Sequence, residues 1–497
     1  SAYTKTITVG DRAGTDTNPI NATGIYVEAQ GDLSATPAVP YEIKAKIVAG
    51  KKSVGIFSNP GVNKSYVKYL GTQMNLGEGA TGFFVNGKTE LDTAAATTTI
   101  NLAGGVVAYV TESSEFVAGK TTVNLSKSAI GVYGERGAQV DVGSWTFNNN
   151  GNAAEEVRLK EGQAKVTTNK NLKPKMVLTH VINGETYIVS GKTVKSIADG
   201  SHAAGKNIGL MAEGIKNPGG TTWTQGNYEI VNQGTIDFTA GIKSTALYAA
   251  SARVKNDGTI KMGAQSTGIY GIYRSDSPHY YGGSSADNKL TVESTANSMM
   301  ELGQESVGVY LKNASTGINL DGKITSSAGA TKNVGIYMIN EAGTQPDQGQ
   351  ILTGMVNGSN SEITLGDGSV GLYSRGKGSA AADRNTVTNN GKITVGKKIA
   401  GAPSVGIYAE NTNLSTGISS DVTVGEDGIA FYGKNSEITA NGTVNFNNKG
   451  VLAYLEDSKF VSHLGNISPT QNTMIYLKNS TAEMDGAGTK VDLDVAD

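Results

Sequence analysis

The stretch from Asn390 to Tyr408 decides the fold. It reads Asn390-Gly-Lys-Ile-Thr-Val-Gly396 and, after a short spacer, Ser404-Val-Gly-Ile-Tyr408. Each half alternates apolar and polar residues as a short β-strand does, and glycine or asparagine at its borders favours a turn. Strands of about three to six residues cannot bury an apolar side alone. The stretch therefore predicts strands that need similar strands beside them.

The second half of this stretch recurs along the chain as glycine, an aliphatic residue, and tyrosine or phenylalanine. Clear copies start at Gly24, Gly55, Gly82, Gly131, Gly268, Gly308, Gly335, Gly371 and Gly406, and looser copies at Gly209, Ala246 and Met474. The shortest steps between copies are about 22 residues, and the longer steps are irregular. This pattern predicts a coil of near-constant circumference with insertions at its corners. Copies at Gly105, Gly428 and Gly450 have extra residues before the aromatic residue, which we interpret as strand bulges.

Composition supports a folded β-protein and excludes several classes. Glycine accounts for 66 of 497 residues and proline for only 10, without the three-residue period of collagen. The chain is 38% hydrophobic and 17% charged, which is too apolar for a disordered chain. A net charge of -2 indicates neither a nucleic-acid-binding face nor a polybasic membrane anchor. Cysteine is absent, which suits passage through an oxidising periplasm but is equally compatible with drift.

We therefore predict an all-β fold, a right-handed parallel β-helix of about 17–20 coils, in which each strand pairs with its equivalent one turn later. Alternation places the residues on both sides of the glycine inside and the glycine and tyrosine outside. The inward residues would be Val54, Ile130, Val334 and Val405, with Ile56, Val132, Ile336 and Ile407. The outward tyrosines would form a ladder. Their rings either cover the neighbouring glycines or form a rail for sugars or a partner protein.

Asparagine recurs three residues after the aromatic residue, at Asn313, Asn340, Asn411, Asn435 and Asn479. Asparagine tolerates a left-handed backbone and hydrogen-bonds to its neighbours. We therefore predict a structural corner with stacked asparagines at this position.

The predicted organisation has three parts. Residues 1–147 form the first part of the β-helix, residues 148–205 an insertion, and residues 206–497 the continued helix with a loop insertion near 273–288. In the insertion, Asn183-Gly184 separates two alternating apolar runs, which is a strong signal for a protruding β-hairpin. The 78 residues between Gly131 and Gly209 could equally hold two degenerate coils.

The loop from Tyr273 to Gly283 is the candidate binding surface. It gathers residue types that are common in binding surfaces, Arg274, Asp276, His279, Tyr280 and Tyr281. Asp276, or a neighbouring carboxylate such as Glu301, could accept a guanidinium group. An ordered but inert loop is the alternative.

No catalytic, cofactor or metal site is expected. Acidic residues occur singly at turns, whereas β-helical polysaccharide lyases and hydrolases need clustered carboxylates. The four histidines, His180, His202, His279 and His463, lack metal-ligand spacing. A non-enzymatic protein is thus favoured over a polysaccharide-cleaving enzyme or a phage tailspike.

The Ser/Asn-Val-Gly-Ile-Tyr signature behind Asn-x-Gly-x-Ile-x-Val-Gly resembles the passenger regions of large fusobacterial autotransporter adhesins, most of all the arginine-inhibitable kind. The resemblance covers nearly the whole chain except residues 148–205. It implies type V secretion and display on the cell surface, with anchoring through a C-terminal outer-membrane barrel outside this sequence. The implied function is adhesion, as a monomer, to a host-cell receptor or to a surface protein or glycan of a partner bacterium, as in coaggregation. A passive stalk that carries a distal binding tip is the other alternative.

Overall fold

The computed structural model describes residues 5–15, 18–20, 22–28, 31–34, 36, 38–59, 64–92, 97–214, 229–273, 290–313, 318–341, 355–446, 449–464, 473–486 and 489–495. The chain divides into unit 1 (Ser1–Glu213 and Gln225–Gly241) and unit 2 (Gly214–Thr224 and Ile242–Asp497). Within the described residues, the one helical element is a 3-10 turn, η1 (Ala381–Asp383), and all other elements are strands.

Unit 1 is a stack of coils whose strands form three parallel sheets. Sheet 1 contains β4 (Thr23–Glu28), β7 (Val54–Asn59), β10 (Ala80–Val85), β13 (Gly105–Val110), β16 (Ala129–Gly134), β19 (Ala154–Lys160), β22 (Met176–Ile182) and β25 (Ile208–Glu213). Sheet 2 contains β5 (Tyr41–Ile43), β8 (Ser65–Tyr69), β11 (Gly87–Leu91), β14 (Glu115–Val117), β17 (Gln139–Asp141), β20 (Gln163–Val166), β23 (Glu185–Ile188) and β26 (Glu229–Asn232). Sheet 3 comes in two pieces. The first contains β1 (Thr6–Val9), β6 (Lys46–Ala49), β9 (Gln73–Leu76), β12 (Thr98–Leu102), β15 (Thr121–Leu125) and β18 (Thr146–Asn148), and the second β21 (Lys170–Leu172), β24 (Thr193–Ser196) and β27 (Thr235–Phe238). A short antiparallel hairpin, β2 (Ala13–Thr15) and β3 (Asn18–Ile20), lies outside these sheets.

Unit 2 repeats the same three-sheet plan. Sheet 1 contains β28 (Thr245–Ala250), β31 (Thr267–Ile272), β34 (Val307–Lys312), β37 (Val334–Ile339), β40 (Val370–Arg375), β43 (Val405–Glu410), β46 (Ile429–Lys434), β49 (Val451–Glu456) and β51 (Thr473–Lys478). Sheet 2 contains β29 (Arg253–Asn256), β32 (Thr291–Ser294), β35 (Ile318–Leu320), β38 (Met355–Asn357), β41 (Asn385–Asn389), β44 (Thr412–Thr416), β47 (Glu437–Ala440), β50 (Lys459–Ser462) and β52 (Ser480–Gly486), with β53 (Thr489–Val495) antiparallel to β52. Sheet 3 contains β30 (Thr259–Met262), β33 (Met299–Leu302), β36 (Lys323–Ser326), β39 (Glu362–Leu365), β42 (Lys392–Val395), β45 (Asp421–Val424) and β48 (Thr443–Phe446).

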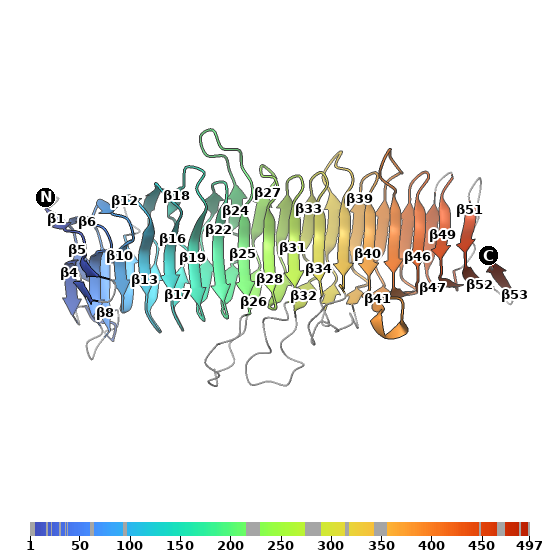
Figure 1. Ribbon diagram of the computed structural model, residues 1–497, viewed down its shortest axis with the longest axis horizontal. Helices are drawn as coiled ribbons and strands as arrows, with labels where there is room; N and C mark the ends of the chain where they lie inside the picture. Colours follow the sequence, from blue (N-terminus) through green and yellow to red (C-terminus); the bar gives the residue numbers. More distant parts are fainter. Residues whose placement is uncertain are drawn as a thin grey trace. The chain divides into compact units, whose positions relative to one another are not determined.

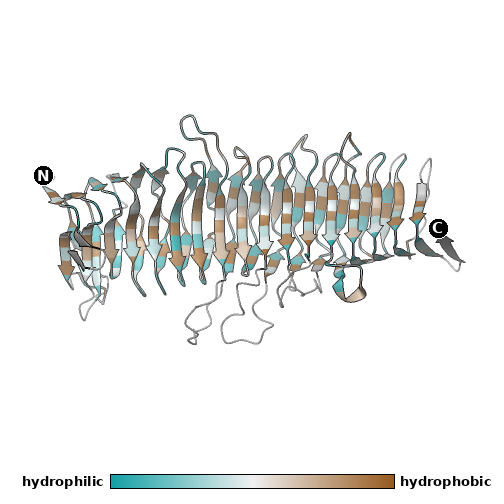
Figure 2. Cartoon of the chain, viewed as in Figure 1, coloured by the Kyte–Doolittle hydropathy of each residue, from teal (hydrophilic) through white to brown (hydrophobic). Residues whose placement is uncertain are grey.

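In both units a strand pairs in parallel with its equivalent in the next coil, as β34 does with β37 and β37 with β40. Within each unit, Figure 1 shows the strands of sheet 1 side by side with their arrows in one direction. In Figure 2 apolar and polar segments alternate along these strands. The predicted all-β fold, a parallel β-helix, is confirmed.

The aliphatic residue after the signature glycine lies in the core, as predicted. Ile56, Val132, Ile336 and Ile407 are at most 1% exposed. The residues before the glycine differ from the prediction, because Val54, Ile130 and Val334 are only half-buried and Val405 alone is buried.

The signature glycine itself faces inward, so its predicted outward position is wrong. A Cβ atom on Gly335 would lie 2.7 Å from Cγ2 of Ile363 in sheet 3 and 2.5 Å from the carbonyl oxygen of Gly371 in the next coil. Two successive residues, the glycine and the aliphatic residue, therefore face the core in each signature strand.

The three predicted bulges are absent, because in these strands a residue other than glycine occupies the inward position of the signature glycine. The register aligns Tyr109, Tyr432 and Tyr454 with the aromatic residues of adjacent strands without an extra residue. The glycine position is occupied in these strands by buried residues, Val107, Ala430 and Leu452. Gly105, Gly428 and Gly450 were thus misaligned with the signature.

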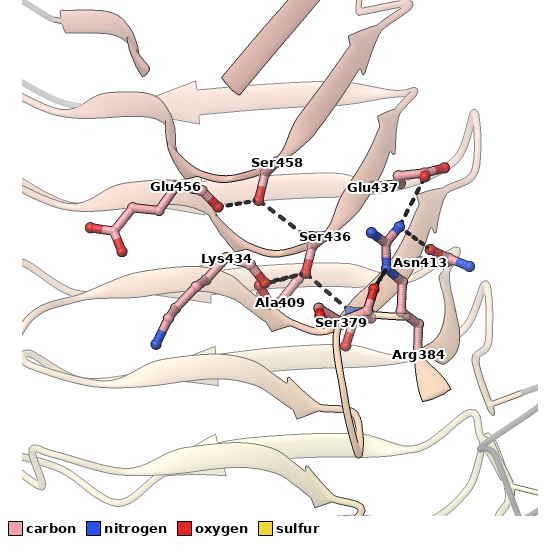
Figure 3. A network of polar contacts seen from close by, with 10 residues as sticks. Ser379, Arg384, Ala409, Asn413, Lys434, Ser436, Glu437, Glu456 and Ser458 are labelled. Carbon is pink, nitrogen blue, oxygen red and sulfur yellow. Dashed lines mark hydrogen bonds and ion pairs between the residues drawn. The ribbon is translucent and has the colours of Figure 1, made fainter. Parts of the chain in front are cut away.

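Buried hydroxyl and amide oxygens connect the coils at the start of the signature strands in unit 2. The backbone N–H of Ser266 donates to Oγ of Ser306 at 3.1 Å, and that of Ser306 donates to Oδ1 of Asn333 at 2.8 Å. Another such row lies at the corner after the signature strands, where the N–H of Ser436 donates to Oγ of Ser458 at 3.0 Å (Figure 3). These contacts satisfy interior N–H groups that the sheet ladders leave unpaired.

The left-handed backbone of the predicted asparagine corner is confirmed for four of the five residues. Asn313, Asn411, Asn435 and Asn479 have φ values of 54°, 49°, 49° and 46°, in the left-handed region. Asn340 differs: it is buried, and its Nδ2 donates to Oδ1 of Asn385 at 2.8 Å.

The predicted hairpin insertion at 148–205 is not formed. β22 and β23, the two runs on either side of Asn183-Gly184, pair in parallel with β19 and β20 of the preceding coil and belong to different sheets. Asn183 has a φ of 53°, so the Asn-Gly pair forms a left-handed corner rather than a hairpin turn. Residues 148–205 therefore continue the coils, as in the alternative of degenerate coils.

Candidate binding surfaces

The outer face of sheet 1 in unit 2 carries a continuous ladder of stacked tyrosines. Adjacent ring centroids lie 4.4–5.2 Å apart and adjacent ring planes differ by 2–14°. The ladder consists of Tyr248, Tyr270, Tyr310, Tyr337, Tyr373, Tyr408, Tyr432, Tyr454 and Tyr476. The parallel register of the strands brings these residues into line, so the predicted ladder is confirmed.

The stacking determines which part of each ring a ligand can reach. Because each interior ring has another ring against both faces, its π-faces are covered and its edge and hydroxyl group remain accessible. The last ring, Tyr476, is 45% exposed. The ladder therefore presents a row of phenol groups about one coil apart and not the open ring faces on which sugars stack.

The hydroxyl groups of Tyr310, Tyr373 and Tyr432 stay protonated at neutral pH. Burial, together with neighbouring tyrosines and carboxylates, raises the pKa of Tyr310, Tyr373 and Tyr432 to about 12. Each phenol can therefore donate a hydrogen bond and accept one.

Two further rows flank the tyrosines on the same face. Two positions after the tyrosine, the strands align Lys312, Ile339, Arg375, Glu410, Lys434, Glu456 and Lys478. Lys434 Nζ lies 3.2 Å from Oε1 of Glu410. Three positions before the tyrosine, half-buried Val307, Val334 and Val370 are in register. The face thus combines aliphatic, aromatic and mixed-charge rows, a composition common in protein interfaces.

Unit 1 begins a similar ladder and then interrupts it. Tyr26, Phe57, Phe84, Tyr109 and Tyr133 stack with ring centroids 4.5–5.7 Å apart. The next strands place Arg158, His180 and Met211 in the same register position. The sequence signature is therefore lost over these coils although the coils persist.

A charged cluster occupies the interruption. His180 Nε2 lies 3.1 Å from Oε2 of Glu213, and its Nδ1 lies 3.5 Å from Oε1 of Glu155. Arg158 donates two hydrogen bonds of 2.7 Å to Glu155. Burial lowers the pKa of His180, but the hydrogen bonds and charges of the two glutamates outweigh burial and raise it to about 9. His180 is therefore an imidazolium at neutral pH, held between two carboxylates.

A shallow groove of about 470 Å³ lies along sheet 3 in unit 1. Its polar side is an amide ladder in which Nδ2 of each asparagine donates to Oδ1 of the preceding one, at 2.7 Å from Asn101 to Asn75, 2.8 Å from Asn124 to Asn101 and 2.9 Å from Asn148 to Asn124. We did not predict this ladder, although the recurrent aliphatic-Asn-Leu pattern at 74–76, 100–102 and 123–125 is visible in the sequence.

The predicted binding residues cannot be assigned to these surfaces. Arg274, Asp276, His279, Tyr280 and Tyr281 lie outside the described residues. At the border of their loop, Tyr273 is described and is 6% exposed. Glu301, the proposed guanidinium acceptor, lies on β33, where its Oε2 is 3.7 Å from Nζ of Lys261.

A second corner loop, between β40 and β41, is fixed by one arginine (Figure 3). Arg384 donates from Nε to the carbonyl of Ser379 at 3.0 Å and from Nη1 to Glu437 at 2.9 Å. It also reaches Oδ1 of Asn413 at 3.3 Å, and its side chain is 16% exposed. This loop is thus pinned to sheet 2.

Within the part of the chain that the structure describes, no group of three or more histidine, cysteine or acidic residues is arranged to hold a metal ion. In the same residues, no helix has the length and apolar character needed to span a membrane. No known protein family and no curated protein matches this chain.

Proposed function

We propose that this chain is part of a non-enzymatic cell-surface adhesin, the passenger of an autotransporter, that attaches to other bacteria or host cells. The observation that carries the proposal is the outer face of sheet 1 in unit 2. There the coil stack aligns partly exposed tyrosines with an aliphatic row and a mixed-charge row. Tyrosine provides a large contact area with few rotatable bonds, which suits recognition of a protein or glycan surface.

The covered ring faces favour one mode of recognition. A ligand on this face would contact ring edges and phenol hydroxyls, so hydrogen bonding and edge contacts would dominate over ring stacking. An extended ligand could contact several equivalent groups in succession, and such repeated weak contacts add to avidity.

The proposal is tested with the purified chain immobilised on beads and exposed to candidate partner bacteria and host cells. We expect binding, and we expect it to fall at least tenfold when Tyr337, Tyr373 and Tyr408 are all replaced by serine. A matched control replaces Thr364, Thr394 and Thr423, on the outer face of sheet 3, by alanine and should bind like the parent. Replacing the same tyrosines by phenylalanine keeps the stack and isolates the contribution of the hydroxyl groups.

Circular dichroism must show that every variant retains its β-structure. A folded serine variant that binds like the parent would exclude this face, and a parent chain that binds no cell would favour a passive stalk. Cleavage of a polysaccharide by the chain would instead support the β-helical enzymes. Free arginine in the assay tests the arginine-inhibitable kind of adhesin that the signature resembles.

A further inference from the structure

Two ionisable residues occupy the interior of unit 1 at positions that hold glycine or apolar residues in neighbouring coils. Glu156 on β19 takes the place of the signature glycine Gly131, because the residues on either side of the two are paired. Lys170, at the start of β21, takes the position of Val194 in the next coil of sheet 3. Both side chains are 1% exposed. The repeat itself gives no reason for charged groups here.

The two side chains are in direct contact. Nζ of Lys170 lies 2.9 Å from Oε2 of Glu156, and it also donates to the carbonyl oxygens of Trp145 at 2.7 Å and Gly143 at 3.3 Å. The indole Nε1–H of Trp145 donates to the same Oε2 at 3.1 Å. Since a carbon–oxygen bond is about 1.2 Å long, Nζ is no more than about 4.1 Å from Cδ of Glu156.

The second carboxylate oxygen is the anomaly. Oε1 of Glu156 is buried and has no hydrogen-bond partner. Buried polar atoms without a partner are rare in folded proteins, and each one calls for an explanation.

Burial disfavours the charged forms of both groups. Burial raises the pKa of Glu156 and lowers the pKa of Lys170, against the opposing effect of each on the other. A neutral carboxylic acid is an electrophile, and a neutral amine is a nucleophile.

We propose that Lys170 and Glu156 condense into an intramolecular isopeptide bond. The lone pair of Nζ attacks Cδ while the indole N–H of Trp145 holds Oε2, on which negative charge develops. The C–Oε1 bond then breaks, and Oε1 leaves as water with one proton from the carboxylic acid and one from the amine. The product is a secondary amide, and no oxidant, reductant or external reactant is needed.

The product resolves the anomaly. The orphan Oε1 has left, Oε2 becomes the amide oxygen and still accepts from Trp145, and the remaining N–H can donate to the carbonyl of Trp145. The bond would join β19 of sheet 1 to β21 of sheet 3. It thus lies where sheet 3 is interrupted, since β18 and β21 belong to separate pieces of that sheet.

The test is the intact mass of the purified full chain under denaturing conditions. We expect a mass lower by one water molecule than the sequence requires, with a tryptic map that places the loss on a branched peptide containing Glu156 and an uncleaved Lys170. Lys170→Met and Glu156→Leu should each restore the full mass. Lys173→Met removes a lysine that pairs with Asp199 near the surface (Nζ to Oδ1, 3.3 Å) and should keep the deficit.

The parent protein decides the question even if the interior variants fail to fold. A parent chain of full mass after prolonged incubation, with normal cleavage after Lys170, would show that the residues remain an ion pair and would overturn the proposal. A water loss on any other peptide would overturn it as well.

Discussion

Replacement of Gly335 by alanine tests the inward orientation of the signature glycine. The added Cβ would lie 2.5 Å from the carbonyl oxygen of Gly371 and 2.7 Å from Cγ2 of Ile363. Overpacking of this kind costs about 1–3 kcal/mol, and the upper part of this range applies because the carbonyl belongs to the backbone of a strand that cannot easily move. The lower entropy of the unfolded alanine chain returns about 0.4–1 kcal/mol. We therefore expect a net loss of about 2 kcal/mol.

The measurement is guanidinium denaturation followed by circular dichroism, with hydrogen exchange of β37 and β40 to detect local opening, because coil stacks can unfold in parts. The matched control is Ala430→Gly, at the same position of β46, where a side chain is accommodated. It should cost about 1–2 kcal/mol, from the backbone entropy of glycine together with the loss of one buried methyl group. If Gly335→Ala were as stable as the parent, the glycine would face solvent, and the inward orientation would be refuted.

Three further predictions concern the surface clusters. The raised pKa of His180 stabilises the fold fully below its unfolded pKa of about 6.5, and this stabilisation is lost as the pH rises through about 9. The free energy of unfolding, measured by denaturation, should therefore fall by up to about 3 kcal/mol less between pH 6 and pH 10 in His180→Gln than in the parent, and an equal fall would refute this role of His180. Asn101→Ala removes the two hydrogen bonds that Asn101 makes in the amide ladder, and we expect the free energy of unfolding to fall by about 1–2 kcal/mol in the same denaturation assay. No loss of stability would show that water replaces the amide. Arg384→Ala should speed hydrogen exchange in residues 376–384 while global stability changes by less than about 1 kcal/mol, because its partner Glu437 is well exposed; unchanged exchange would show that the loop is held by other contacts.

The coil architecture could be predicted because the repeated sequence signature places the same residue types at the same position of each coil. A parallel stack places equivalent residues above one another, so a recurring aliphatic residue such as Ile336 and a recurring tyrosine become a buried row and an outer ladder. The orientation of Gly335 could not be obtained in this way, since strict alternation does not allow two successive inward residues.

Residues 148–205 were interpreted as an insertion, with degenerate coils only as the alternative, because their register positions carry different chemistry. Arg158 and His180 replace the aromatic residue, and Asn183-Gly184 has the composition of a hairpin turn. A left-handed corner and a hairpin turn need the same residue types, so only the pairing partners distinguish them.

The candidate surfaces were only partly visible in the sequence. The tyrosine ladder follows from the repeat, but the stacking that hides its ring faces depends on the parallel register of adjacent coils. The cluster around His180 joins residues from three strands whose spacing in the sequence is irregular. No sequence motif therefore predicts that these residues come together.

The tyrosine ladder also has a spectroscopic consequence. Its phenol rings are nearly parallel chromophores at 4.4–5.2 Å, close enough for their electronic transitions to couple. Such coupling splits and intensifies the near-ultraviolet dichroism of tyrosine, and excitation energy absorbed by one ring can migrate along the column. The signal depends on the unbroken sequence of rings, so the opening of a single coil, or a ligand that tilts a few rings, would change the spectrum without any added label.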